Sequence, residues 1–416
     1  MLARAAYRRL LARTGGFSPA ARQFLVFSLL LSTAFAIFNL VFNLYMSALG
    51  FSNEVIGLFN SLPAIALLAV GLPAAAMADR LGYRLFLLGG GGLAVVASLT
   101  LAIVQTPLLA VLAAGAFALA VIVLGVLGSP LLTQLSSQTE RVAVFSFNES
   151  LAWLATLIGD LVGGVIPEAA ARMIHASSAS ATALRSAFVA TAVLALLSLP
   201  FLFQLVRGAD LKPVAMIPVR ELLQVDVARF GRILLPSLIL GIAAGMYLNF
   251  VQLYLAQRFG LTPGPIGVIL AVGAALTVAV TLAAPAVSRR LGITRTIGLA
   301  QIVGSPLVLA LAFLMVLPIA VVVMYVRQLA LNLQGPLGQV FGMEYVEGSQ
   351  RARLATAQAV VSGVGVGGIG PLLSGFLQVR GGYQLAFSIS AVFYLLAGLT
   401  FLWLFGKVRL PSERET

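Results

Sequence analysis

The sequence contains no cysteine, a single histidine and few charged residues, which make up 9% of its 416 residues. Without cysteine the chain has no disulfide, no thiolate metal site and no cysteine nucleophile. One histidine and no clustered carboxylates also leave no constellation for catalysis, so we expect neither an enzyme nor a bound metal or other cofactor. Soluble globular chains carry about 25% charged residues, so this low charge, with 60% hydrophobic residues, excludes that class.

Long apolar runs divide the sequence into segments of similar length. A membrane-spanning helix needs about 20 mostly apolar residues, and helices satisfy backbone groups in hydrocarbon within one segment. The sequence therefore predicts an all-α integral membrane protein with twelve transmembrane helices. The predicted spans are 24–49, 55–78, 85–105, 107–132, 143–167, 184–206, 232–257, 265–287, 296–316, 318–340, 354–377 and 383–406.

The formal net charge of +13 reflects topology rather than binding to nucleic acid. If the N-terminus is inside, most of the 26 Lys and Arg residues fall in cytoplasmic segments. An excess of basic residues in short loops marks the cytoplasmic side. We therefore expect a multi-pass protein of the plasma (inner) membrane with both termini in the cytoplasm and no nucleic-acid partner. The basic residues expected in outer loops are Arg172, Arg185, Arg258 and Arg380.

The second half of the sequence repeats features of the first half at a constant offset. Without a gap, Asn39 aligns with Asn249, Gly50 with Gly260, and Arg80-Leu81-Gly82 with Arg290-Leu291-Gly292. This repeat predicts two pseudo-symmetric six-helix bundles, 1–206 and 232–416, joined by a cytoplasmic linker, 207–231. The linker contains either a short amphipathic helix on the membrane surface or solvated chain. In a membrane, two such halves leave a site at their shared interface, near mid-depth.

The loop between the second and third spans carries a recognisable motif. Asp79, Arg80, Gly82 and Arg84 match the pattern G-x-x-x-D-R-x-G-x-R/K, although Ala75 stands where the first glycine is expected. With its twelve spans and two halves, the whole chain resembles the major facilitator superfamily of secondary transporters. The resemblance implies that spans one, four, seven and ten line a central cavity and that the two halves move by alternating access.

The resemblance also implies an inner gate. Asp79 would face the inner end of span eleven, near Arg351 and Arg353, and would latch the state that is closed to the cytoplasm. A carboxylate is favoured at the N-terminal end of a helix. Arg289 replaces the aspartate in the second half, so the latch is asymmetric. Alternatively, Asp79 and Arg84 only anchor a tight loop, since exposed charges often contribute little.

Small residues are dense in the fifth and eleventh spans, where they allow helix backbones to approach closely. Many antiporters of the superfamily carry G-P-x-x-G-G in span five, but this chain has Asp160 where the proline is expected, and the proline form appears in span eleven. The match favours export, although the diagnostic proline is in the other half. The residues expected at these helix contacts are Gly159, Gly163, Gly164, Gly370, Pro371 and Gly375.

Two charged residues lie deep in predicted spans, Asp160 and Arg327. A charge there costs about 2.5–3.5 kcal/mol on insertion scales, so such groups normally face a cavity or a partner. We interpret Arg327 as the counter-ion of an anionic group on the substrate and Asp160 as the group that carries a proton. Alternatively, the two pair with each other, or Arg327 binds backbone carbonyls.

Amide side chains complete the expected substrate site. Asn39 and Asn43 share a face of span one, Asn249 and Gln252 share a face of span seven, and Gln334 follows Arg327 in span ten. Aromatic residues are expected beside them: Phe38, Phe42, Tyr45, Tyr247 and Tyr254. The alternative role of the amides is interhelical hydrogen bonding.

These observations predict a monomeric secondary transporter that moves a small, amphipathic organic molecule, most simply by export coupled to proton entry. Its partners are then the substrate, protons and the lipid bilayer. A uniporter or proton symporter for a small organic anion or sugar is the alternative within the class. A non-transporting receptor or scaffold is a distant alternative, because no large soluble domain is present. The sequence does not identify the substrate, the direction of transport or the coupling ion.

Overall fold

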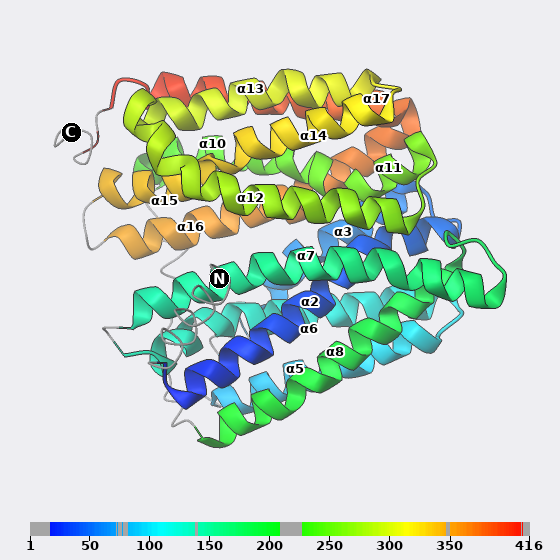
Figure 1. Cartoon of the computed structure of the whole chain (residues 1–416). Helices are drawn as coiled ribbons and strands as arrows, with labels where there is room; N and C mark the ends of the chain where they lie inside the picture. The colour runs from blue at the N-terminus through cyan, green and yellow to red at the C-terminus, as the bar shows by residue number, and fades with distance from the viewer. Residues whose placement is uncertain are drawn as a thin grey trace, which may run out of the picture. The chain divides into compact units, whose positions relative to one another are not determined.

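The computed structural model describes residues 17–71, 73, 77, 82–137, 140–208, 227–346, 350–408 and 410. Every regular element within these ranges is a helix, which confirms the predicted all-α class. Figure 1 shows the helices coloured in chain order. In the first 208 residues they are α2 (Pro19–Ala48), α3 (Asn53–Ala66), the π-helix η1 (Leu67–Gly71), α5 (Tyr83–Ile103), α6 (Pro107–Leu135), α7 (Arg141–Ile174) and α8 (Ala181–Gly208).

The remaining helices follow the segment that joins the two halves of the sequence. Two of the predicted spans are broken into two helices each, α10 with α11 and α14 with α15. The helices are α10 (Val227–Leu248), α11 (Val251–Phe259), α12 (Pro263–Leu291), α13 (Ile293–Phe313), α14 (Leu317–Asn332), α15 (Gln334–Tyr345), α16 (Arg351–Val364), the π-helix η3 (Gly365–Ile369) and α17 (Gly370–Phe405).

The described part of the chain contains eleven helical stretches long and apolar enough to cross a membrane. The last, Arg353–Phe405, has 53 residues and a length of about 80 Å, more than twice the hydrocarbon thickness. Its helix is broken at Gly381 (φ −145°, ψ 20°) and Gly382 (φ 62°, ψ −166°). Because a side chain rarely tolerates the conformation of Gly382, this glycine separates spans eleven and twelve. All twelve predicted spans are therefore represented by apolar helices.

The sequence repeat is also a repeat of backbone conformation. Gly50 and Gly260 have φ values of 87° and 67°, and Gly82 and Gly292 have φ values of 92° and 83°. Positive φ favours glycine. Gly260 ends α11 and Gly292 ends α12, whereas Gly82 directly precedes α5. The aligned glycines therefore form equivalent turns in the two halves.

Contacts within the chain divide it into two compact units. Unit 1 comprises Met1–Val41 and Ala66–Met216, and unit 2 comprises Phe42–Ile65 and Ile217–Thr416. Segment 42–65, which holds the ends of the first two spans predicted to face outward, thus packs with the second half of the sequence. The predicted boundaries 1–206, 207–231 and 232–416 stay a prediction, and a helix within 209–226 lies outside the described residues.

Small residues bring helices together inside each unit. In unit 1, a Cβ atom on Gly159 of α7 would collide with the side chain of Ala36 and lie 3.0 Å from the carbonyl oxygen of Thr33, both on α2. In unit 2, a Cβ atom on Gly375 of α17 would meet the carbonyl oxygen of Asn53 on α3. Backbones in contact at these positions leave no room for a larger residue.

Candidate functional site

Arg327 lies inside unit 2, with 2% of its surface exposed. Its Nη2 donates a hydrogen bond of 2.7 Å to the hydroxyl oxygen of Tyr394 on α17. Its guanidinium carbon is 3.8 Å from the ring centroid of Tyr247 on α10. The guanidinium group thereby joins α14 to α10 and α17. Arg327 therefore has a structural role in unit 2, and its predicted role in binding an anionic group of the substrate stays a prediction.

Aromatic residues extend from Arg327 through the interior of unit 2. The ring centroids of Tyr247 and Phe387 are 5.3 Å apart, and those of Tyr254 and Phe387 are 5.1 Å apart. The Tyr254 hydroxyl donates a hydrogen bond of 2.7 Å to the carbonyl oxygen of Leu311. Tyr247 and Tyr254 are buried, like Phe38, Phe42 and Tyr45. These side chains therefore belong to the packed interior, and the expectation that they lie beside a substrate stays a prediction.

Asn249 lies where α10 ends and α11 begins. Its Nδ2 donates to the carbonyl oxygens of Gly245 (3.0 Å) and of Val366 in η3 (2.9 Å). The backbone carbonyl oxygen of Asn249 accepts hydrogen bonds from Nδ2 of Asn43 (2.5 Å) and of Asn60 (3.5 Å). Breaks in a membrane helix release backbone groups that need new partners. This arrangement supplies them, as expected of amides that hold spans together.

The other predicted amides have different surroundings. Asn39 is exposed on α2, and Gln252 is half-buried on α11. The Oε1 of Gln334 accepts a hydrogen bond of 2.9 Å from Nε2 of Gln301, a buried residue of α13. Asn43 and Asn249 are thus brought together within unit 2, whereas Gln334 pairs with another span. Their roles in substrate binding stay predictions.

Asp160 lies near the middle of α7, in unit 1, and is 8% exposed. Its neighbour Gly159 touches α2, and one turn further Gly163 would place a Cβ atom 3.3 Å from the Cα atom of Ile37. Among the described residues, the Asp160 carboxylate has no hydrogen-bond partner. A buried carboxylate without a partner is costly. Asp160 is therefore an unusual residue in unit 1, because its acidic group is buried.

The predicted inner gate is described only in part. Asp79 and Arg80 lie outside the described residues, as does the side chain of Arg351 at the start of α16. Gly82 supplies the turn before α5, and the side chains of Arg84 and Arg353 are exposed. The latch between this loop and span eleven therefore stays a prediction.

A polar network in unit 2 was not anticipated from the sequence. Asn53, at the start of α3, donates through Nδ2 to Oε1 of Gln257 (3.1 Å) and of Gln378 (2.8 Å). The Tyr383 hydroxyl donates to the same Gln257 oxygen at 2.8 Å. Gln257 also donates to the hydroxyl oxygen of Ser47 at 3.3 Å. The signal in the sequence was a cluster of amide side chains at the ends of predicted spans. Polar residues at span ends are ordinarily expected to be solvated in loops.

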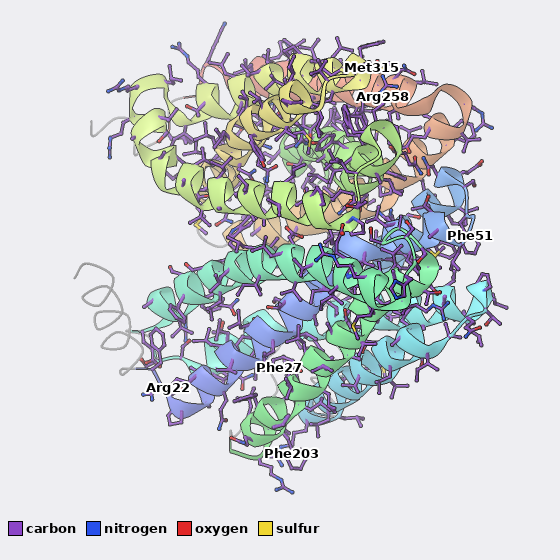
Figure 2. The ribbon with its side chains drawn as sticks, turned by 45° about the vertical axis from the view of Figure 1, so that its right-hand side comes forward. Arg22, Phe27, Phe51, Phe203, Arg258 and Met315 are labelled. Carbon is purple, nitrogen blue, oxygen red and sulfur yellow. The ribbon has the colours of Figure 1, made fainter. Side chains whose placement is uncertain are left out.

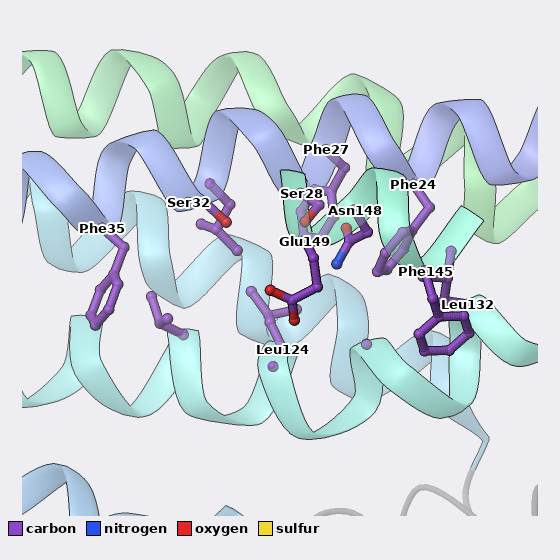
Figure 3. A pocket seen from close by; sticks show the side chains of 14 residues that line it. Phe24, Phe27, Ser28, Ser32, Phe35, Leu124, Leu132, Phe145, Asn148 and Glu149 are labelled. Atoms are coloured by element: carbon purple, nitrogen blue, oxygen red, sulfur yellow. The ribbon is translucent and has the colours of Figure 1, made fainter. Parts of the chain in front are cut away.

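A cavity of about 200 Å³ in unit 1 was also missed. It lies between α2, α6 and α7, and Figure 3 shows the carboxylate of Glu149 near its centre, with the Asn148 amide beside it. Phe27, labelled on α2 in Figure 2, is part of its wall. The signal in the sequence was Glu149 itself, an acidic residue within the predicted span 143–167.

Comparison with known proteins agrees with this architecture. A bacterial homolog of the human lysosomal transporter Spinster, in an inward-facing and occupied conformation, gives a TM-score of 0.74 at 12% identity, covering 92% of this chain and 96% of that chain. The nucleoside transporter NupG gives 0.71 at 17% identity, covering 93% and 99%. A D-xylose-proton symporter gives 0.70 at 15% identity, covering 92% and 96%. At these identities the likeness concerns the fold alone.

The sequence gives no match among curated proteins. A family model does match it, that of the Major Facilitator Superfamily, over residues 24–366. The match covers most of the chain and extends into both halves. The apolar helices of the described residues and the similar solved structures agree with it. The chain therefore belongs to the Major Facilitator Superfamily and is a membrane transporter rather than an enzyme.

Proposed function

We propose that the protein is a monomeric secondary transporter of the plasma membrane, with both termini in the cytoplasm, that exports a small amphipathic organic molecule in exchange for protons. The observation that carries the proposal is Asp160, a buried carboxyl group without a hydrogen-bond partner among the described residues. Taking up a proton removes the cost of burying this charge, and releasing the proton requires access to water. Such a group couples proton movement to a change of access.

Alternating access is supported by the amide network at the predicted outer ends of the spans. Segment 42–65 is bound to the second half of the sequence through neutral hydrogen bonds of Asn53, Gln257 and Gln378. Each such bond contributes about 0.5–1.5 kcal/mol net, so these bonds can break at a modest cost in free energy. We propose that this network, the outer seal, closes the outer side when the inner side is open.

Transport in proteoliposomes tests the proposal and its direction. With an acidic lumen, protons leave down their gradient, so an antiporter accumulates substrate inside whichever way the protein is inserted. A proton symporter accumulates substrate only when the outer medium is the more acidic. The compounds assayed are amphipathic molecules with positive, negative or no charge, and protein-free liposomes correct for passive trapping of amines. Accumulation with the acidic outer medium would replace export by symport.

The Asp160→Asn variant tests the coupling residue. We expect it to lose accumulation driven by the pH gradient but to retain exchange of labelled for unlabelled substrate, because exchange needs no net proton movement. Glu168→Gln is the matched control, since it removes a carboxylate from the same helix, near the C-terminal end of that helix. Gradient-driven accumulation by Asp160→Asn at the wild-type level would exclude Asp160 as the coupling residue.

A further inference from the structure

The cavity in unit 1 is lined by a negatively charged side chain. Among the described residues that line it, Glu149 is the only charged one, and none is Lys, Arg or His. Among the described residues, the Glu149 carboxylate forms no hydrogen bond or ion pair, and its side chain is exposed. A carboxylate in such a place attracts a positively charged group from the cavity. None of the described residues of unit 1 competes as a partner.

Uncharged acceptors surround this carboxylate. The hydroxyl groups of Ser28 and Ser32 project from successive turns of α2, and Figure 3 places Ser28 and the Asn148 amide beside Glu149. The Oδ1 atom of Asn148 is buried and accepts no hydrogen bond from the described residues. Because the terminal torsion of an asparagine has two broad minima, rotation can turn this oxygen toward the cavity. An N–H donor of a ligand then supplies the partner that the described residues do not provide.

Aromatic rings form much of the remaining wall. Phe24, Phe27 and Phe35 come from α2, and Phe145 comes from the turn of α7 that precedes Glu149. Figure 3 shows Phe24 and Phe145 on one side of the carboxylate and Phe35 on the other. The faces of aromatic rings attract cations electrostatically, and the same rings accommodate apolar groups. The wall therefore suits a ligand with a positive head and an apolar body.

The volume limits the size of that ligand. Sites for drug-sized molecules occupy about 300–1,000 Å³, whereas this cavity has about 200 Å³. A single ring with a short side chain fits this space better than a fused polycyclic compound. Glu149 lies about 12 Å along α7 from its first residue, Arg141, so the ligand would sit in the half of unit 1 predicted to face the cytoplasm.

We infer that this cavity is a binding site for the protonated amine of a small aromatic compound, with Glu149 as the counter-ion and the phenylalanine rings around its body. The inference rests on the proposed transporter function and gives its substrate class. It places the positively charged head of the substrate in unit 1, beside Glu149. The carboxylate and the unpaired acceptors together select against anions.

Binding of three probes of similar size to the purified full-length protein tests the inference. The probes are 2-phenylethylammonium, its neutral counterpart 2-phenylethanol, and the anion 3-phenylpropanoate, with dissociation constants measured by ligand-observed NMR. We expect the ammonium to bind about tenfold more tightly than the alcohol, a ratio that corresponds to about 1.4 kcal/mol. The anion should bind more weakly than either. Phe145→Leu should weaken ammonium binding more than alcohol binding, because only the cation gains from the ring face.

The Glu149→Gln variant keeps the shape of the side chain and removes its charge. We expect it to bind the ammonium and the alcohol equally, whereas the matched Glu168→Gln variant, about 28 Å further along α7, should keep the preference. Equal binding of the three probes to the wild type, no binding, or an unchanged preference in Glu149→Gln would overturn the inference. None of these results depends on transport or on Asp160, so the proton-coupling proposal is tested separately.

Discussion

Replacing Tyr394 by phenylalanine removes a single hydroxyl group from the buried surroundings of Arg327. The guanidinium Nη2 then loses its acceptor at 2.7 Å, while the Tyr247 ring remains 3.8 Å from the guanidinium carbon. Arg327 is 2% exposed, so water has little access to replace the lost partner. Because Arg327 joins three helices of unit 2, we expect Tyr394→Phe to destabilise the folded protein.

The magnitude follows from the kind of bond that is lost. A hydrogen bond to a charged group contributes about 1.5–3 kcal/mol to stability. The contact with the Tyr247 ring adds about 2 kcal/mol in a desolvated setting. Replacing a buried charge by an apolar residue can be neutral, because the cost of desolvation disappears with the charge. We therefore expect the cost of Tyr394→Phe to vanish when Arg327 is leucine.

A double-mutant cycle measures this difference. The free energy of unfolding is determined in detergent for the wild type, Tyr394→Phe, Arg327→Leu and the double variant. We expect a coupling energy of about 1.5–3 kcal/mol between the two sites. Tyr394→Phe costing the same in both backgrounds would refute the structural role of the contact. Arg327→Lys tests a separate hypothesis, that Arg327 binds an anionic group elsewhere on the substrate, since it keeps the charge but loses the planar group that binds a carboxylate with two bonds.

Three further predictions concern other parts of the chain. Gln257→Leu removes a partner of Asn53 from the outer seal. A single cysteine introduced at Ser47 should then react faster with a reagent added from outside, and an unchanged reaction rate would argue against the seal. Gly159→Ala should lower the thermal unfolding temperature because its Cβ atom collides with α2, whereas Gly89→Ala, with open space around it, should be neutral or stabilising; equal effects would contradict the packing. A cysteine at Lys212 should be labelled only from the cytoplasmic side, and labelling from outside would reverse the topology.

Composition and periodicity alone determined the class of this protein. The bilayer sets both the length of a span and its polarity, so twelve apolar runs predict twelve helices without knowledge of their packing. The repeated glycines were equally informative. Gly82 and Gly292 occur at aligned positions because each precedes a helix with positive φ, a conformation that glycine adopts without strain. The motif around Asp79 predicted the family, which the family model confirms.

The partners of the polar residues were decided by the tertiary structure. Periodicity indicates which face of its own helix a side chain occupies, but not which helix lies opposite. Arg327 was therefore recognised as unusual, while its contacts with Tyr247 and Tyr394 were not foreseeable. Asn249 was likewise expected to face a substrate, and its bonds to Gly245 and Val366 depend on breaks in two helices.

The same limit applies to the cavity around Glu149. Its wall combines residues of α2, α6 and α7, which are distant in sequence and meet only because the helices pack in a particular order. The sequence of α7 alone does not indicate that Glu149 lies beside a cavity. The site arises from three helices whose side chains leave a space between them, and the packing of several chain segments determines such a space, whereas the pattern of any one of them does not.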